Sequence, residues 1–329
     1  MKASNTFTRL LDRFANVRAL VIGDLMLDRY IWGQVQRISP EAPIPVVRVT
    51  KESLHAGGAA NVAMNIRALG GQVATCGIVG KDSDGRRLLQ SINAIGSDIA
   101  GIIASRATQT ISKTRIIAHN QQVVRLDREH EDIDSRLRAR LRAFIVSQID
   151  QFDAVIVSDY GKGAIDQELL TLLMELRKQR RFLYLIDPKR RNFPYYQGAS
   201  LVKPNREEAG LASGLEILGE ESLYQAGDQL LRMWQAEAIL VSRGEEGMSL
   251  FRTGKPPRHF PATAREVYDV TGAGDTVLAT CALALGAGAN MEEAIILANH
   301  AAGIVVGKVG TAVVNPQELQ GVLSKKRAT

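Results

Sequence analysis

Short apolar runs rich in β-branched residues alternate along this chain with stretches of helical periodicity. Six of these runs are apolar throughout, and they cover residues 19–24, 72–80, 153–160, 182–187, 200–205 and 238–243. Strands that are apolar on both faces are typical of a parallel sheet covered by helices on both sides. In one intervening segment, Val62, Ala63, Ile66 and Leu69 fall on one helical face. The sequence therefore predicts a doubly wound, mostly parallel α/β sheet.

Two segments depart from this alternation of strand-like and helical stretches. Residues 30–50 contain three prolines and then alternate around Val47 and Val49, and residues 109–127 have the pattern of a β-hairpin that turns near Asn120. Because these strands come from separate parts of the chain, we expect them to form a small second sheet that acts as a lid. Residues 1–329 would then be one domain with a β lid.

Composition narrows the classes of function. The chain is 45% hydrophobic, which excludes a disordered protein, and its formal net charge is +6. Such a charge suits nucleic acid, an anionic membrane surface or small phosphorylated ligands. Because basic residues never form a long run, we expect no nucleic-acid partner and favour anionic metabolites.

The cysteines and the lengths of the apolar segments indicate in which cellular compartment the protein is expected. Cys76 and Cys281 lie in apolar segments without metal-ligand spacing, which predicts inert core residues in a reducing compartment. The first residues have no apolar signal core, and no uninterrupted apolar run reaches about 18 residues. We therefore expect a cytoplasmic, soluble protein with no membrane partner.

Residues 266–279 read EVYDVTGAGDTVLA, with four small residues between two aspartates and before an apolar stretch. If that stretch is a buried helix, the free amides of its first turn form an anion site, and glycines let a phosphate approach the backbone. Asp275 beside such a site is then a candidate general base. The alternative is that Asp275 caps the helix and the glycines form a tight turn. Spacing alone leaves both interpretations open.

Four ordered segments resemble the ribokinase, or PfkB, family of carbohydrate kinases. Residues 269–275, D-V-T-G-A-G-D, resemble its C-terminal signature. Its N-terminal glycine element, its Asn-x-x-Glu motif and its nucleotide-binding turn are matched by residues 57–61, 203–208 and 242–247. The resemblance spans nearly the whole chain. It implies a ribokinase-like fold, ATP and Mg²⁺ as cofactors, and an anion hole made by Gly272, Ala273 and Gly274.

Other segments resemble the heptose 7-phosphate kinases of this family: residues 24–30, 37–43, 159–163 and 187–189. This resemblance implies ATP-dependent phosphorylation of the anomeric C1 hydroxyl of D-glycero-β-D-manno-heptose 7-phosphate, in lipopolysaccharide core biosynthesis. Many such kinases are followed by an adenylyltransferase. Because this chain stops at residue 329, we expect that second activity to be absent.

Asp24 and Asp28 follow the first predicted strand, at the edge where open α/β sheets bind ligands. Their functional interpretation is hydrogen bonding to sugar hydroxyls, and the alternative is a cap and a turn residue. The resemblance implies that Gly57 and Gly58 let the sugar lie against the backbone while Asn61 bonds a hydroxyl. The alternative there is a helix end packed closely on the sheet.

The nucleotide side is also assigned by resemblance. Asn205 and Glu208 would organise the water shell of Mg²⁺, although an Asn-x-x-Glu pair is also typical of a helix cap. The expected contacts of ATP are Ser242, Gly244 and Gly247, with Asn299 and Gly303 bordering the adenine.

A sugar 7-phosphate needs basic residues at the end of the site remote from ATP. The candidates are Arg87, Lys113, Arg115, Lys162, Lys189 and Arg191. Lys162 and Lys189 follow main-sheet strands, and the glycines around Lys162 make it the preferred candidate. Any one of these residues could instead be a solvated surface charge.

Three rival functions remain. Another kinase of the family, such as a fructose 1-phosphate or ketodeoxygluconate kinase, shares every motif. A sugar-phosphate-binding regulator could keep the fold without catalysis, although the proposed base and anion site are intact. A dinucleotide-dependent dehydrogenase is disfavoured because no G-x-G-x-x-G follows the first strand. Related kinases pair their lids, so we expect a homodimer through the lid.

Overall fold

The computed structural model describes residues 2–119, 121–129, 132–264, 266–308 and 310–325. Its main sheet has nine strands, and seven neighbouring ones are parallel. In sheet order the strands are β13 (Lys255–Phe260), β12 (Met248–Arg252), β11 (Ile239–Ser242), β10 (Leu201–Val202), β9 (Leu183–Asp187), β8 (Ala154–Ser158), β1 (Arg18–Gly23), β4 (Gln72–Gly80) and β5 (Asp98–Ser105). The six predicted strands are all present, which confirms the mostly parallel α/β sheet.

Three strands of this sheet were not predicted from the sequence. β5 is only half-buried, and β12 and β13 form an antiparallel hairpin at the opposite edge. β13 contains Pro256 and Pro257 and is largely exposed. Proline is tolerated there because an edge strand leaves one row of backbone groups unpaired. The apolar-run pattern finds only strands that are covered on both faces.

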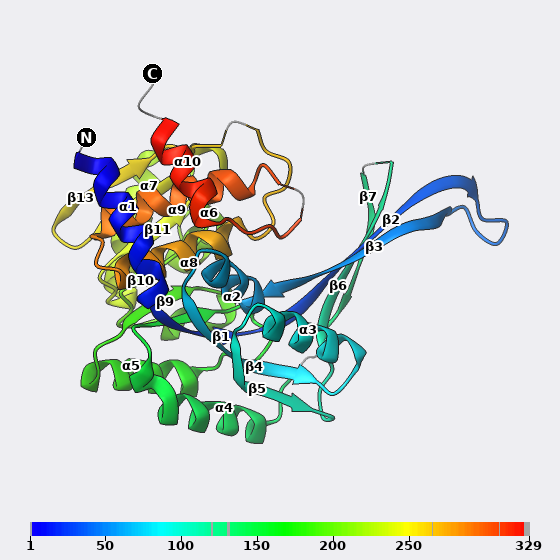
Figure 1. The fold of residues 1–329 in the computed structure, drawn as a ribbon, viewed down its shortest axis with the longest axis horizontal. Helices are drawn as coiled ribbons and strands as arrows, with labels where there is room; N and C mark the ends of the chain where they lie inside the picture. The colour runs from blue at the N-terminus through cyan, green and yellow to red at the C-terminus, as the bar shows by residue number, and fades with distance from the viewer. Residues whose placement is uncertain (1, 120, 130–131, 265, 309, 326–329) are drawn as a thin grey trace.

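Helices cover both faces of the sheet (Figure 1). The helices that pack on one face are α1 (Lys2–Arg13), α2 (Ala59–Ala68), α3 (Ser83–Ala94), α8 (Ala273–Gly286), α9 (Met291–Val305) and α10 (Pro316–Lys325). The helices on the other face are α4 (Ser135–Gln148), α5 (Gln167–Gln179), α6 (Arg206–Ser213) and α7 (Glu220–Trp234). β1 serves both layers, because Ala19 and Val21 join one core and Leu20 and Ile22 the other. No helix in the described part of the chain is long and apolar enough to cross a membrane.

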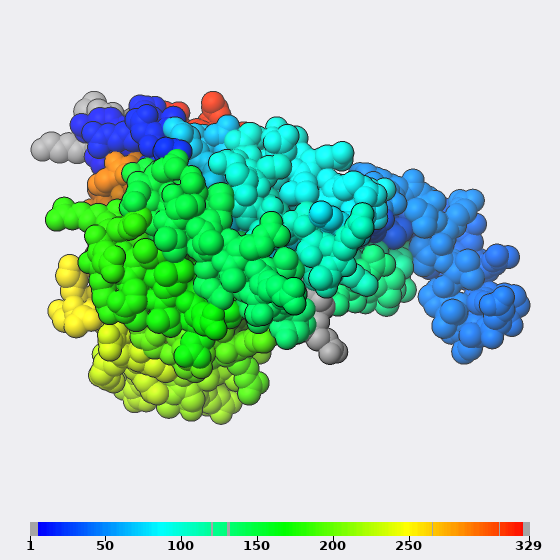
Figure 2. All heavy atoms as spheres, turned by 90° about the horizontal axis from the view of Figure 1, so that it is seen from below, coloured from blue at the N-terminus to red at the C-terminus, as the bar shows by residue number. Residues whose placement is uncertain are grey.

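The lid is a separate four-stranded sheet. Its strands, in order, are β3 (Pro45–Gly58), β2 (Leu25–Ile38), β6 (Ile111–Ala118) and β7 (Gln121–Arg128). They run beyond the segments 30–50 and 109–127 that the sequence assigned to the lid, while Asn120, where we placed a turn, lies outside the described residues. The lid projects from the body in Figure 1, and Figure 2 shows its β2–β3 hairpin (blue) extending past the face covered by α4 and α5 (green).

The end of β1 is the point where body and lid meet. Only Asp24 separates β1 from β2, and β3 leads directly into α2. Gly23 lies so close to its neighbours that a Cβ there would be 2.1 Å from the Ser158 carbonyl oxygen and 2.9 Å from the Ala59 Cβ. The central strands, the base of the lid and α2 therefore converge on one small region.

We predict that Gly23→Ala destabilises the protein by about 1–3 kcal/mol, because β8 or α2 must shift to admit the methyl group. The measurement is the midpoint of thermal unfolding, which should fall by several degrees. Gly321→Ala, in helix α10 with open space around its Cβ, is the matched control and should not lower the midpoint. Equal midpoints for both variants would contradict this packing.

Candidate functional site

Asp275 lies in the first turn of α8 and is almost fully buried, with 4% of its surface exposed. Its Oδ2 accepts a hydrogen bond from Asn61 Nδ2 at 2.7 Å, and its Oδ1 accepts one from the Tyr160 hydroxyl at 3.0 Å. Burial raises the pKa of Asp275 to about 7, the Asp187 carboxylate adds to this, and the two donors oppose it. The carboxyl group is therefore poised to take up or release a proton near neutral pH.

A buried amide network fixes the orientation of Asn61. Asn65 Nδ2 donates to the Asn61 backbone carbonyl at 2.9 Å and approaches Asn61 Oδ1 at 3.3 Å. Thr276 in turn donates from Oγ1 to Asn65 Oδ1 at 2.8 Å. Because Asn61 Oδ1 faces Asn65, its Nδ2 is directed at Asp275. We expected Asn61 to bond a sugar hydroxyl, whereas here its amide holds the acid.

The predicted anion hole is only partly free. Gly272 caps α8 with φ of 79°, a left-handed conformation that favours glycine. The Ala273 amide donates to the Val270 carbonyl at 3.2 Å, so it is not available to an anion. The amides of Gly274 and Asp275 have no acceptor outside their own helix among the described residues. Since the positive end of the helix dipole adds to them, an anion would bind at these amides.

Lys203 is a buried cation beside the anion hole, and the sequence interpretation assigned it no role. Its Nζ lies 3.0 Å from Asp187 Oδ1, at the end of β9. A Cβ on Gly274 would lie 3.1 Å from this Nζ, so the glycine leaves room for the lysine. Burial opposes the charge, but the carboxylates of Asp187, Glu208 and Asp275 together outweigh it and raise the pKa of Lys203. A lysine directly after an apolar strand was the available sequence signal.

The loop after β8 brings Tyr160 to Asp275. Asp24, which is 1% exposed, accepts backbone hydrogen bonds from Tyr160 and Lys162 at Oδ2 and from Ala164 at Oδ1. The expectation that Asp24 contacts the sugar is therefore corrected: its oxygens face three backbone amides, and it shapes this loop.

A second acid supports the same loop. Asp159 Oδ1 accepts from the Gly161 amide at 2.7 Å, and its Oδ2 accepts from Tyr196 and Asn192. Burial raises the pKa of Asp159 to about 6. Two buried carboxylates thus organise the loop that carries Tyr160.

Asp28 lies on β2 at the base of the lid, where sugar hydroxyls could reach it. Arg115 on β6 forms an ion pair with its Oδ1, and the Arg115 guanidinium stands 5.1 Å from the centre of the Tyr30 ring. A Cβ on Gly57 would be 2.1 Å from Asp28 Oδ2, so only glycine lets the carboxylate lie across β3. Gly58 follows with φ of 59° and is the N-cap residue of α2. Asp28, Gly57, Gly58 and Arg115 are therefore brought together, as the sequence interpretation required.

Of the two main-sheet lysines predicted to hold the distal phosphate, only Lys189 lies elsewhere, because the partner of Lys162, Glu129, also acts electrostatically on Lys113 of the lid. Lys162 forms an ion pair with Glu129, and Lys189 Nζ forms one with Glu208 Oε1 at 2.9 Å. Lys189 is thereby placed at the Asn-x-x-Glu motif on the nucleotide side. This corrects its assignment to the end of the site remote from ATP.

The other basic residues that the sequence suggested for binding the sugar 7-phosphate fall into two groups by exposure. Arg87 on α3 and Arg191 are exposed, whereas Lys113 and Arg115 are half-buried and lie two residues apart on β6. The lid strand, rather than the main sheet, therefore supplies the enclosed basic residues.

Asn205 and Glu208 form a capping box at the start of α6. Asn205 Oδ1 accepts from the Glu208 amide at 2.8 Å, and Glu208 Oε2 accepts from the Asn205 amide at 3.1 Å. The helix cap, which the sequence analysis gave as the alternative role of this pair, is thus present. Carboxylate and amide oxygens can bind the water molecules that surround a Mg²⁺ ion. Glu208 pairs with Lys189 and acts electrostatically on Asp187, so the capping box lies close to both of these residues.

The residues assigned to ATP lie at the end of β11, in the turn after it and within α9. Ser242 pairs with Asn205 in a parallel bridge, and the turn that it enters contains Gly244 with φ of 61° and Gly247 with φ of 88°. Asn299 and Gly303 instead attach α9 to residues 261–264. Asn299 Nδ2 donates to the Pro261 carbonyl at 2.8 Å, so its amide is committed to that segment.

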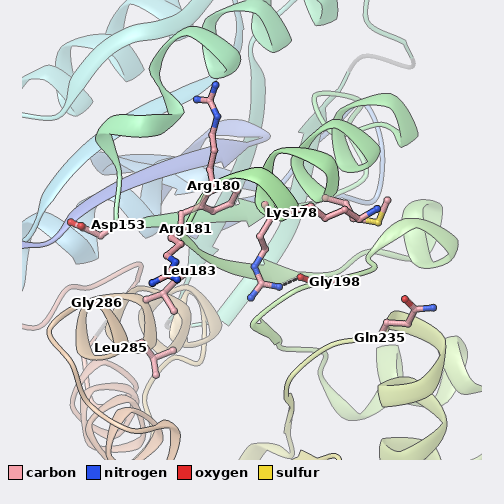
Figure 3. A pocket seen from close by; sticks show the side chains of 12 residues that line it. Asp153, Lys178, Arg180, Arg181, Leu183, Gly198, Gln235, Leu285 and Gly286 are labelled. Carbon is pink, nitrogen blue, oxygen red and sulfur yellow. Dashed lines mark hydrogen bonds between the residues drawn. The ribbon is translucent and has the colours of Figure 1, made fainter.

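A separate hollow of about 670 Å³ lies at the amino ends of β8 and β9 (Figure 3). Leu285 and Gly286, at the far end of α8 from Asp275, line it. At 1.5 Å per residue, Gly286 is about 16 Å along the helix from Asp275. Arg177 there is bonded to the Gly198 carbonyl and Glu237, and Arg180 forms an ion pair with Asp150. This hollow therefore belongs to a different face from the acid and the anion hole.

The pattern of the pfkB family carbohydrate kinases matches residues 17–318. This chain belongs to the pfkB family of carbohydrate kinases. It is 46% identical to the bifunctional protein HldE of Geobacter sulfurreducens over 308 residues and to that of Geobacter metallireducens over 307 residues. Each alignment covers 93% of this chain and 63% of the relative. The chain thus spans less than two thirds of the length of these curated relatives.

Solved structures show the same fold. Phosphofructokinase-2 from Escherichia coli in complex with substrates and products is similar with a TM-score of 0.79, over 94% of this chain and 98% of that one. Arabidopsis thaliana ribokinase complexed with ribose and ATP has a TM-score of 0.73, over 93% and 98%. Both are 18% identical to this pfkB kinase. The ribokinase-like fold expected from the motifs is confirmed.

We predict that kcat/KM for sugar phosphorylation decreases about tenfold per pH unit below about pH 7, because a base must be deprotonated to act. This decrease is the acid limb of the pH profile. Tyr160→Phe removes a donor that favours the ionised carboxylate, so the limb should move to higher pH. The measurement is the pH profile of kcat/KM. Tyr224→Phe on α7, far from the acid, is the control and should leave the limb in place. An unmoved limb in Tyr160→Phe would contradict the contact.

Proposed function

We propose that this kinase transfers the γ-phosphoryl group of ATP to the anomeric C1 hydroxyl of D-glycero-β-D-manno-heptose 7-phosphate, giving the 1,7-bisphosphate and ADP. The observation that carries the chemistry is the buried Asp275 carboxyl beside Lys203 and the amides of Gly274 and Asp275. The choice of sugar is supported by the segments that resemble heptose 7-phosphate kinases and by the similarity to bifunctional protein HldE. The reaction would take place in the cytoplasm and supply heptose for lipopolysaccharide.

The transfer step uses Asp275 as base. The C1 oxygen forms a bond to the γ-phosphorus while the bond from that phosphorus to the bridging oxygen of ADP breaks, and the hydroxyl proton passes to an Asp275 carboxylate oxygen. Asn61 and Tyr160 hold both carboxylate oxygens, so the acid needs little reorganisation when it takes up the proton. The pKa of about 7 gives Asp275 useful basicity while leaving much of it ionised at neutral pH.

The charge on the transferring phosphoryl group meets preorganised positive groups. The free first-turn amides of α8 and the Lys203 ammonium would point at the same oxygens. Asn205 and Glu208 would hold Mg²⁺ through water, and the bound ion would neutralise the nucleotide phosphates. Closure of the lid over the sugar would exclude water as a competing acceptor.

We predict ADP release with heptose 7-phosphate and none with fructose 1-phosphate, ribose or ketodeoxygluconate. Asp275→Asn should lower kcat by about 10²–10⁴-fold, because amide nitrogen and oxygen cannot accept the proton at this pH. Asp228→Asn, an exposed acid on α7, is the matched control and should keep full activity.

Two results would contradict parts of this proposal. Turnover of another sugar would retain the kinase mechanism and remove the heptose assignment. Tight binding of a sugar phosphate without ADP from any substrate would favour a regulator that kept the fold.

We also propose a homodimer through the lid. Apolar side chains that are 42% to 60% exposed gather on its strands and hairpin: Ile38, Ile44, Val49, Val123, Val124 and Leu126. Burying them against a second copy would also cover the free edges of β3 and β7.

For the dimer, we predict that the double change Ile38→Lys and Leu126→Lys produces monomers in sedimentation velocity, because two charges would have to be buried. Leu218→Lys, an 81% exposed leucine outside the lid, should not change the mass. A wild-type protein that sediments as a monomer at micromolar concentration would refute the pairing.

A further inference from the structure

Tyr30 is the last buried residue of the lid strand β2. It is 3% exposed, whereas the residues that follow it on β2 are half-buried or exposed. Three lid side chains surround its ring. The Trp32 ring stacks on it with the ring centres 5.7 Å apart, the His55 ring meets it edge-on at 5.4 Å, and the Arg115 guanidinium stands 5.1 Å from its centre. The ring of Tyr30 is therefore held by the lid.

The hydroxyl end of Tyr30 reaches the body of the protein. A Cβ on Gly310 would lie 4.0 Å from Tyr30 Cζ, so the ring packs against the segment that follows α9. Burial raises the pKa of Tyr30, the nearby Asp269 carboxylate adds to this, and the Thr271 side chain opposes it. Tyr30 thus bridges the lid and the segment that leads into the anion hole.

This body segment is tied to the start of α8. Asp269 accepts hydrogen bonds from the Thr271 amide at 2.8 Å and from the Gly310 amide at 3.0 Å. Thr271 is followed directly by Gly272, the N-cap of α8. A Cβ on Gly272 would lie 2.5 Å from Asn61 Nδ2, so this turn has little free space. A displacement of Thr271 would therefore reach the first-turn amides of α8.

The Tyr30 hydroxyl is an unsatisfied polar group. Its oxygen is fully buried and makes no hydrogen bond with any residue in the described part of the chain. Burying a hydroxyl away from water is unfavourable unless it gains a partner. The Thr271 hydroxyl, which can both donate and accept, lies on the side of the anion hole that Tyr30 faces. A small inward movement of the lid would complete a hydrogen bond between them.

We propose that Tyr30 is a positioning residue that couples closure of the lid to the alignment of the anion hole. When ATP and the acceptor are both bound, the lid closes, and the Tyr30 hydroxyl donates a hydrogen bond to the Thr271 hydroxyl. This bond fixes the first-turn amides of α8 in the direction of the transferring phosphoryl group. The proposal rests on the proposed function only in requiring a sugar acceptor under the lid.

The test is a double-mutant cycle on kcat, measured by ADP release at saturating ATP, Mg²⁺ and the sugar phosphate that the wild type turns over fastest. Tyr30→Phe keeps the ring and removes the hydroxyl, and Thr271→Val removes the partner hydroxyl. Each change should lower kcat by about 3- to 10-fold, and the double variant should lose no more than either single one.

Two control variants keep the hydroxyl pair intact. Thr271→Ser retains the partner hydroxyl and should keep kcat within about twofold of the wild type. Tyr224→Phe removes a tyrosine hydroxyl on α7, where it is hydrogen-bonded to His259, and should leave kcat unchanged.

Binding of the acceptor separates positioning of the anion hole from construction of the sugar site. The dissociation constant of the sugar phosphate, measured by titration calorimetry without ATP, should change less than about twofold in Tyr30→Phe, because the hydrogen bond forms only when both substrates are bound. A dissociation constant that rises as much as kcat falls would make Tyr30 part of the sugar site and overturn the coupling.

The remaining outcomes separate the coupling from the choice of sugar. An unchanged kcat in Tyr30→Phe, or a double variant whose loss is the product of the two single losses, would overturn the coupling while leaving heptose 7-phosphate as substrate. Turnover of a different sugar by the wild type would remove the heptose assignment, and the same cycle with that sugar then tests the coupling. A wild type that releases no ADP with any sugar would overturn both.

Discussion

The structure of the site depends on keeping one carboxyl group, that of Asp275, buried without losing its ability to ionise. Burial and the Asp187 carboxylate raise its pKa, while hydrogen bonds from Asn61 and Tyr160 restrain that rise and fix both oxygens. Each donor is held by a support of its own: Asn65 and Thr276 orient Asn61, and Asp24 and Asp159 shape the loop of Tyr160. The α/β fold makes this possible because β1 and β8 end, and α2 and α8 begin, at the same edge of the sheet.

Much of the fold followed from the sequence because its signals are local. Strands such as β1 and β8 are apolar at every position, and burial on both faces requires that. The glycine-rich segment at the start of α8 likewise indicated the anion hole and Asp275, because its small residues and its acid are adjacent in the chain. The edge strand β13 was missed because it is exposed and contains two prolines. β12 is buried, but it is only five residues long and is interrupted by Ser249 and ended by Arg252, so it forms no continuous apolar run.

The errors in the site arose where a role depends on which partner a side chain finds. Asp24 and Asp28 look alike in sequence, yet Asp24 meets three backbone amides and Asp28 meets Arg115. Lys189 forms an ion pair with Glu208 on the nucleotide side and does not lie at the distal end of the site. Lys203 was overlooked because its partner, Asp187, comes from another strand, and sequence order does not give the adjacency of β9 and β10.

The most direct test of the central claim is the titration of the Asp275 carboxyl group itself. The carboxyl carbons can be followed by NMR in protein labelled with ¹³C-aspartate, and the Asp275 signal is identified by its loss in Asp275→Asn. The account predicts a midpoint about pH 7, set by burial and the neighbouring Asp187 charge. A midpoint near the ordinary aspartate value of about 4 would contradict it, because Asp275 would then be too weak a base for the proposed role.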